Sequence, residues 1–198
     1  MANENVADGV KALAAVVFET SDEINNVSAE FAAALAARGH RLAGLIQVSA
    51  NMPGCACPET HVLDLASGVR IPILQKLGSQ SQACRADSAA LADAASIVRQ
   101  ALISPPDLLF INRFGRLESE GKGMREEIGA AAFSGIPVLV GVATRYLGDW
   151  RNFALGLSEE LSCRLEVLEA WWQRLERARL EQARLGRALI GATVLPGS

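Results

Sequence analysis

Residues 107–142 read DLLFINRFGRLESEGKGMREEIGAAAFSGIPVLVGV, and this stretch decides the fold. Its first six residues, 107–112, are an apolar run behind two prolines, and its last six, 137–142, are a second apolar run. Both runs are too short for a helix and lack polar alternation, so each predicts a strand that is buried on both faces. With helical sequence between them, the stretch predicts a βαβ unit of a parallel sheet.

The segment between the two strands predicts where a site would lie. Residues 113–123 form a polar, glycine-rich loop, and a helix is expected from about residue 124 to residue 134, before the stop signal Gly135. In parallel sheets the loops at the carboxyl ends of the strands carry the site. Residues 112–123 are therefore the expected active loop.

Composition and charge exclude several classes of protein. Half of the 198 residues are apolar, which suffices for the core of one domain, or of one domain with an appendage. The net charge of -3 and the isoelectric point of about 5.5 argue against nucleic acid or an anionic membrane as a partner. The first residues lack the basic region of a signal peptide, and no apolar run approaches the ~18 residues of a membrane span. We expect a soluble cytoplasmic protein.

The amino-terminal part predicts a strand at 12–18, a helix, and a second strand at 42–48. A phosphate-binding loop would lie between the first strand and the helix. Residues 19–26 read ETSDEINN, with no glycine, no lysine and three carboxylates where a triphosphate would need donors. The phosphate loop is therefore absent or replaced, and Ser21 or Asp22 is expected to cap the helix.

The middle of the chain predicts a hairpin at a sheet edge, formed by residues 61–67 and 69–75. Residues 77–86 are a polar loop. A helix follows from the N-cap Asp87 and stops at the prolines of 104–106.

The carboxyl-terminal part predicts a long helix or helix pair at 159–189. Apolar residues recur there in alternating steps of four and three, the pattern of a helix that packs on another helix: Leu161, Leu165, Leu168, Trp172 and Leu175. This helix either packs on its own sheet or forms a homodimer, and Trp171-Trp172 is a candidate exposed face for a protein partner. The expected parts are an amino-terminal tail at 1–11, an α/β domain at 12–157 and a helical extension at 158–198.

Four motifs together resemble a bacterial family of uncharacterised domains: NRFGRLESEGKG at 112–123, SGIPVLVGV at 134–142, ATRYLGDWRNFA at 143–154 and LGSQSQACRAD at 77–87. That family is similar to small nucleoside triphosphatases of the P-loop class and is sometimes found beside molybdenum-transport genes. The likeness covers roughly residues 12–172. It implies a three-layer P-loop-like α/β fold with a mainly parallel sheet of about five strands, an inserted hairpin and a helical appendage.

The chain departs from that class at the residues that bind the metal ion and the phosphates. In the active enzymes a lysine and a hydroxyl residue of the first loop hold the phosphates and Mg²⁺, and an aspartate after the strand matching 107–112 holds the metal's water shell. Here Asn112 is neutral, Arg113 is positively charged, and the first loop has no lysine. The chain therefore resembles a degenerate P-loop protein without a standard magnesium–nucleotide site. If hydrolysis survives, the resemblance implies Glu118 as the base.

The expected ligand is a small anion, a nucleotide or an oxyanion such as molybdate, in the crevice beside the active loop. Arg113 and Arg145 follow strand ends, so their guanidinium groups could converge on an oxyanion. Tyr146 and Trp150 could supply a stacking wall. The candidate binding residues are Asn112, Arg113, Gly115, Lys122, Arg145, Tyr146 and Arg85. Alternatively, the arginines are solvated or pair with nearby carboxylates: Glu118, Glu120 and Asp149.

The cysteines offer a second kind of site. Cys55 and Cys57 lie in one expected loop and Cys84 in another, with His61 nearby in sequence, so thiolates and an imidazole could hold Zn²⁺ or a softer metal. Alternatively Cys84, beside Arg85 and close to a helix N-terminus, is a reactive thiol.

Three functions of different classes remain open. Non-hydrolytic binding of a small anion is the preferred one. The others are a residual nucleoside triphosphatase, and a metal-binding or scaffold protein that acts through its cysteines or its carboxyl-terminal helix.

Overall fold

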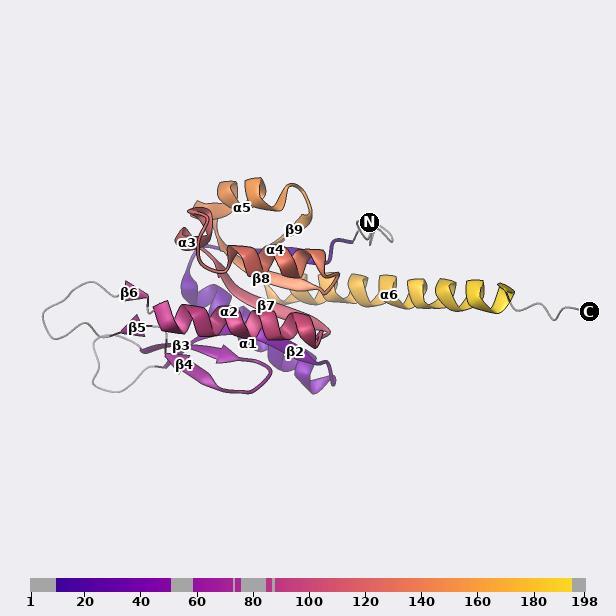
Figure 1. Ribbon diagram of the computed structural model, residues 1–198, viewed down its shortest axis with the longest axis horizontal. Coiled ribbons are helices and arrows are strands. Elements are labelled where there is room, and N and C mark those ends of the chain that lie inside the picture. The colour runs from indigo at the N-terminus through magenta and orange to yellow at the C-terminus, as the bar shows by residue number, and fades with distance from the viewer. Residues whose placement is uncertain (1–9, 51–58, 73, 76–84, 87, 194–198) are drawn as a thin grey trace, which may run out of the picture.

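A seven-stranded sheet with the order β4-β3-β2-β7-β8-β1-β9 forms the centre of the computed structural model (Figure 1). The structure describes residues 10–50, 59–72, 74–75, 85–86 and 88–193. The strands of this sheet are β1 (Leu13–Phe18), β2 (Leu42–Ala50), β3 (Glu59–Asp64), β4 (Arg70–Pro72), β7 (Leu108–Phe114), β8 (Val138–Ala143) and β9 (Ser158–Ser162). In the order of the sheet, the neighbouring strands β2, β7, β8, β1 and β9 run parallel to one another. The strand β3 pairs antiparallel with both β2 and β4. The predicted α/β fold with a mainly parallel sheet and an inserted hairpin is confirmed.

Helices cover both faces of the sheet and complete three layers (Figure 1). Ala14 and Val16 of β1 belong to a core shared with α1 and α6, whereas Leu13 and Ala15 belong to a core shared with α2, α4 and α5. Alternate side chains of one strand therefore face two cores, which explains the apolar runs without alternation. The helices are α1 (Ser21–Ala37), α2 (Ser88–Ile103), α3 (Arg116–Ser119), α4 (Arg125–Phe133), the 3₁₀ turn η1 (Thr144–Tyr146), α5 (Leu147–Ala154) and α6 (Leu165–Thr193).

The edge hairpin consists of β3 and β4 and is shorter than predicted. Asp64 ends β3 and closes the turn, because its carboxylate accepts hydrogen bonds from the Ala66 N–H at 3.0 Å and the Ser67 hydroxyl at 2.5 Å. Residues 74–75, predicted in the hairpin, form β5 (Leu74–Gln75) of a separate two-stranded sheet. Its partner is β6 (Arg85–Ala86), which lies in the segment predicted as a polar loop.

The predicted start of the carboxyl-terminal helix is wrong, because residues 158–162 form the strand β9. This strand pairs parallel with β1 along its whole length. The helix α6 begins only at Leu165. Of the residues of β9, Leu161 is the one whose side chain is buried.

The first half of α6 packs on its own sheet. Trp171 and Trp172 are 0 % and 1 % exposed, so the hypothesis that they form an exposed partner face is wrong. The indole N–H of Trp171 donates to the Lys11 carbonyl at 3.1 Å. Farther along α6, Leu180 and Leu185 are 61 % and 65 % exposed. The carboxyl-terminal end of α6 extends past the body of the molecule (Figure 1). Homodimerisation through this distal part stays a prediction.

Among the described residues, none of the helices combines the length and the apolar character that crossing a membrane requires.

Candidate functional site

The carboxyl ends of β1, β7 and β8 lie side by side at the middle of the sheet. The chain leaves β1 into α1 after two residues, leaves β8 directly into η1, and leaves β7 toward α3. Residues far apart in the sequence therefore meet at this edge. It is the edge at which parallel α/β sheets bind their ligands.

The strand β7 continues through the residues predicted to begin the active loop. Ile111 is level with Val140 of β8, but Phe114 is level with Val142, so β7 contains one residue more than its neighbour. Such a bulge redirects side chains. The loop proper therefore begins at Gly115, and it contains the one-turn helix α3.

Because of the bulge, two consecutive side chains of β7 approach the same helix. The Asn112 amide donates to Asn25 Oδ1 at 3.3 Å, and the Arg113 guanidinium donates to the Ser21 hydroxyl at 2.7 Å. Ser21 and Asn25 are four residues apart and share one face of α1. Ser21 and Asn25 therefore belong to the site, although the sequence analysis did not propose them. Their four-residue spacing on α1 is the one feature of the sequence that could have indicated it.

Arg113 is half-buried and lies beside a second positive charge. Burial and then repulsion from Arg145 lower the pKa of Arg113 from its ordinary value, while attraction to Glu118 and Tyr146 raises it. Its guanidinium also lies over the Phe18 ring, 5.9 Å from the ring centroid. Among the described residues, neither Arg113 nor Arg145 forms an ion pair with a carboxylate. The predicted pairing of these arginines with neighbouring carboxylates is therefore not seen in the described part of the chain.

The 3₁₀ turn after β8 holds Arg145 close to the end of β1. Thr144 donates its hydroxyl to the Phe18 carbonyl at 3.2 Å and to Glu19 Oε1 at 2.9 Å. Arg145 is exposed and lies 5.2 Å from the centroid of the Tyr146 ring. The Thr144 bonds fix the backbone that carries both Arg145 and Tyr146.

The amino terminus of α1 is capped by the chain itself. Thr20 is the N-cap, rather than Ser21 or Asp22 as predicted, and its hydroxyl accepts from the Glu23 N–H at 3.4 Å. Glu23 Oε2 in turn accepts from the backbone N–H groups of Thr20 at 3.2 Å and of Glu19 at 3.1 Å. This is a capping box with one additional bond. A carboxylate therefore occupies the end of the helix at which a phosphate would bind.

Two buried polar atoms beside Arg113 have no hydrogen-bond partner among the described residues: Asn25 Nδ2 and Asn112 Oδ1. Asn25 is 6 % exposed. Asn112 Oδ1 lies against Gly141 of β8, where a Cβ would come within 3.4 Å of it. Buried polar atoms in proteins are normally paired, so this pair marks an unsatisfied polar spot next to Arg113.

Glu118 is held inside the loop by backbone groups. It is 5 % exposed, and its two oxygens accept from the Gly115 N–H at 2.9 Å and the Met124 N–H at 3.0 Å. Gly123 adopts a positive φ of 63°, and a Cβ there would come within 2.1 Å of the same carboxylate. Glu118 therefore shapes the loop, and the geometry gives it no contact with an open crevice.

Several other candidates lie elsewhere. Lys122 is exposed on the loop. Trp150 is fully buried against Phe114, with ring centroids 5.3 Å apart, so the stacking wall predicted from it is wrong. The side chain of Arg85 and all of Cys55, Cys57 and Cys84 lie outside the part that the structure describes. Within the described part, no group of three or more histidines, cysteines and carboxylates is arranged to hold a metal ion.

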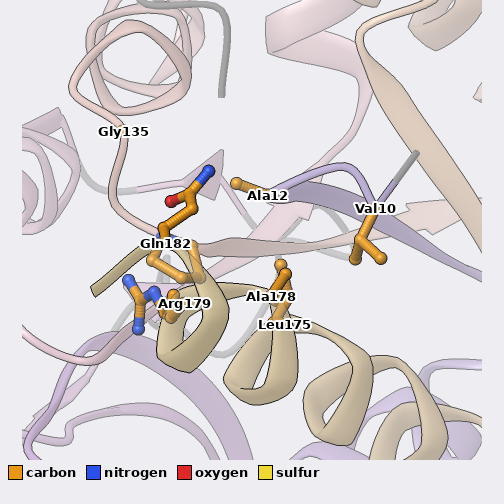
Figure 2. A pocket seen from close by; sticks show the side chains of 8 residues that line it. Val10, Ala12, Gly135, Leu175, Ala178, Arg179 and Gln182 are labelled. Carbon is orange, nitrogen blue, oxygen red and sulfur yellow. The ribbon is translucent and has the colours of Figure 1, made fainter. Parts of the chain in front are cut away.

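Two cavities lie at the opposite, amino-terminal edge of the sheet. One, of about 30 Å³, lies between α6 and the start of β1 and has room for little more than water (Figure 2). The other, of about 480 Å³, lies between α2 and β2 and is lined mostly by apolar side chains, with Arg41, Gln100 and Ser104 among its polar groups. Neither cavity includes a residue that the sequence analysis proposed for the site.

A family model matches residues 13–171, which is most of the chain. The chain belongs to the DUF2478 family. This family is described as proteins of unknown function. The residues at the carboxyl edge of the sheet, from Phe18 to Arg145, all lie within the DUF2478 match.

The comparisons support the resemblance drawn from the sequence. The DUF2478 chain is 36 % identical over 172 residues to the molybdenum import ATP-binding protein ModC 2 of Bradyrhizobium diazoefficiens. The match covers 84 % of this chain and 19 % of that protein, so the chain spans about a fifth of its length. The solution structure of a human cancer-related nucleoside triphosphatase is similar with a TM-score of 0.52 at 14 % identity, covering 75 % of this chain and 86 % of that one. The predicted P-loop NTPase-like fold is confirmed, as is the relation to a molybdenum-transport protein.

Proposed function

We propose that this P-loop NTPase-like protein binds a small anion, without hydrolysing it, between Arg113 and Arg145 at the carboxyl edge of β7, β8 and β1. The observation that carries the proposal is the environment of Arg113. Among the described residues, its half-buried guanidinium has a neutral hydroxyl as its hydrogen-bond partner and a second guanidinium as its neighbour. An anion between two such groups would relieve their repulsion and replace part of their lost hydration.

The polar spot next to Arg113 supports the same position. Asn25 Nδ2 is a donor and Asn112 Oδ1 an acceptor, and both lack a partner among the described residues. A protonated oxyanion, or an anion with a bound water, could satisfy both atoms. The ModC 2 relative is named for molybdenum import, so molybdate is the oxyanion to test first.

Hydrolysis of a nucleoside triphosphate is the weaker candidate. Glu118 was the expected base, but backbone N–H groups already occupy both of its oxygens. At the end of β7, Asn112 and Arg113 stand where the enzymes of the P-loop class place an acidic metal-binding group. A neutral amide and a guanidinium are poor ligands for Mg²⁺, which prefers carboxylates.

Differential scanning fluorimetry of the full chain with molybdate, sulfate, phosphate, ADP and ATP, each with and without Mg²⁺, tests the proposal. A ligand at 100 times its Kd adds about 2.7 kcal/mol to the free energy of unfolding. We expect at least one anion to raise the Tm without Mg²⁺, and the Arg113→Ala and Arg145→Ala variants to lose the shift.

Arg116→Ala is the matched control, because Arg116 lies in the same loop but is exposed and paired with Glu120 at 2.8 Å. Its ligand-induced shift should equal that of the wild type. If no anion raises the Tm, or if the shift survives both Arg113→Ala and Arg145→Ala, the proposal is wrong. Release of phosphate from ATP, dependent on Mg²⁺ and lost in Glu118→Gln, would favour the hydrolase instead.

A further inference from the structure

The hydrogen-bond donors available at the site limit the size of the anion that it can hold. Nucleotide phosphates are usually bound by backbone N–H groups at the amino end of a helix, reached through a glycine-rich loop. Here β1 ends at Phe18 and α1 begins at Ser21, so two residues form the whole connection. A connection of two residues is too short to wrap around a chain of phosphates.

The N–H groups of that connection are already bonded. Those of Glu19 and Thr20 donate to the Glu23 carboxylate at 3.1 and 3.2 Å, and that of Glu23 donates to the Thr20 hydroxyl. The Glu23 carboxylate thus takes the place of a phosphate group at the positive end of α1. A ligand phosphate that used the N–H groups of Glu19 or Thr20 would have to displace it.

The carboxylates around the connection between β1 and α1 would also repel a ligand phosphate, in addition to the loss of the N–H donors. Glu19, Asp22 and Glu23 follow one another closely at the amino end of α1. Glu19 is held beside the end of β8, where its carboxylate accepts from the Thr144 hydroxyl at 2.9 Å. A chain of phosphates that left the two arginines toward α1 would approach like charges, which oppose its binding.

The groups that remain for a ligand are few and close together. They include the guanidinium groups of Arg113 and Arg145, the Ser21 hydroxyl next to Arg113, and Asn25 Nδ2, which has no partner among the described residues. Two guanidinium groups match the one or two negative charges of a single tetrahedral oxyanion. They cannot balance the three or four charges of a nucleoside diphosphate or triphosphate.

We infer that the site accepts a single tetrahedral oxyanion between Arg113 and Arg145 and rejects nucleotides, because the Glu23 carboxylate closes the amino end of α1. The inference rests on the proposed anion site and names the class of its ligand. Glu23 is then the residue that determines specificity, although it does not touch the bound anion.

Isothermal titration calorimetry of the full chain with molybdate, sulfate, ADP and ATP tests this inference. The wild type should bind molybdate or sulfate at least tenfold more tightly than either nucleotide. In Glu23→Ala the freed N–H groups and the removed charge should raise nucleotide affinity at least tenfold, with a smaller change for the single oxyanions. Glu30→Ala is the matched control, because Glu30 is an exposed carboxylate on the same helix, and its affinities should equal those of the wild type.

The outcomes separate the two proposals. If the wild type binds ATP or ADP as tightly as molybdate and sulfate, and Arg113→Ala abolishes that binding, the inference is wrong while the anion site stands. If no anion binds, both are wrong. Should Glu23→Ala fail to fold, Glu23→Gln keeps an oxygen for the capping bonds and removes the charge, and an unchanged preference in that variant would show that the carboxylate's charge does not exclude nucleotides.

Discussion

Glu118 Oε1 accepts a hydrogen bond from the Met124 N–H at 3.0 Å, across six residues of the loop between β7 and α4. The other oxygen accepts from the Gly115 N–H at 2.9 Å, so one carboxylate joins the beginning and the end of the loop. Arg125 adds a third bond by donating to the Glu118 carbonyl at 3.0 Å. A residue expected to act in catalysis therefore determines the shape of the loop.

We expect Glu118→Ala to lower the free energy of unfolding by about 3 kcal/mol. The substitution leaves two backbone N–H groups without their acceptor, and bonds to a charged group contribute about 1.5–3 kcal/mol each. For a chain of this size the corresponding fall in Tm is roughly 6–12 °C. Urea denaturation followed by circular dichroism measures the change, with the exposed Glu30→Ala as a control expected within about 0.5 kcal/mol of the wild type. Equal stability of both variants would contradict the structural role of Glu118.

The two halves of α6 should respond differently to truncation of a large side chain. Trp171 is fully buried and bonded to Lys11, so Trp171→Ala should cost about 3–5 kcal/mol. Leu180 is 61 % exposed on the same helix, and Leu180→Ala should stay within about 0.5 kcal/mol. Light scattering during the same experiments tests the predicted homodimer, which should lose affinity in Leu180→Ala if the distal half mediates it. A Trp171→Ala variant of unchanged stability would contradict the core packing.

The sequence predicts the central strands because a strand that is buried on both faces has apolar residues at nearly every position. The runs at 12–18, 42–48, 107–112 and 137–142 correspond to β1, β2, β7 and β8, although β7 extends to Phe114. The strand β9 has no such apolar run, because it lies at the sheet edge and buries Leu161 alone. Leu161 also stands four residues before Leu165, and this spacing suggested a helix. Backbone pairing with β1 outweighs that pattern, and a single sequence does not show it.

The positions of Arg113 and Arg145 at the carboxyl edge of the sheet were predictable, whereas their role in binding a ligand stays a prediction. That Arg113 and Arg145 follow neighbouring strand ends comes from the order of elements, and the structure brings both to one place. The roles of Ser21 and Asn25 depend on the one-residue bulge in β7, which register alone reveals. The prediction that Trp150 forms a stacking wall was wrong because aromatic side chains occur both in ligand-stacking walls and in hydrophobic cores, and the sequence does not distinguish the two.

Two glycines of positive φ should differ sharply in their tolerance of alanine. At Gly68 of the hairpin turn φ is +73° and a Cβ would meet nothing within 4 Å, so Gly68→Ala should cost about 1–2 kcal/mol for the backbone conformation alone. At Gly44 of β2 φ is +92° and a Cβ would come within 2.0 Å of the Phe110 carbonyl oxygen. Gly44→Ala must also move β2 away from β7, and we expect a loss of more than about 4 kcal/mol. Thermal denaturation of the pair checks this, and similar losses in both would show that β2 and β7 do not pack this closely.

Cys163, between β9 and α6, should be an unreactive thiol at neutral pH. Burial, together with the nearby Glu23 carboxylate, raises the pKa of Cys163 from 9.0 to about 11. At pH 8 the thiolate fraction is then lower by roughly 100-fold, and the higher nucleophilicity of the more basic thiolate restores about tenfold. Peptide-resolved mass spectrometry should therefore find that iodoacetamide alkylates Cys163 about tenfold more slowly in the folded chain than in urea.

The raised pKa of Cys163 also makes the free energy of unfolding fall as the pH rises through the alkaline range. Because the pKa of Cys163 is higher in the folded than in the unfolded chain, its contribution is complete below about pH 9 and is lost as the pH rises toward about 11. Between about pH 9 and about pH 11, the Tm of the wild type should therefore fall relative to that of Cys163→Ala. Between pH 6 and 8 the difference between the two Tm values should stay constant. Glu23→Gln removes the smaller cause and should lower the pKa only in part, because burial remains. Alkylation of Cys163 in the folded chain as fast as in urea would contradict both expectations.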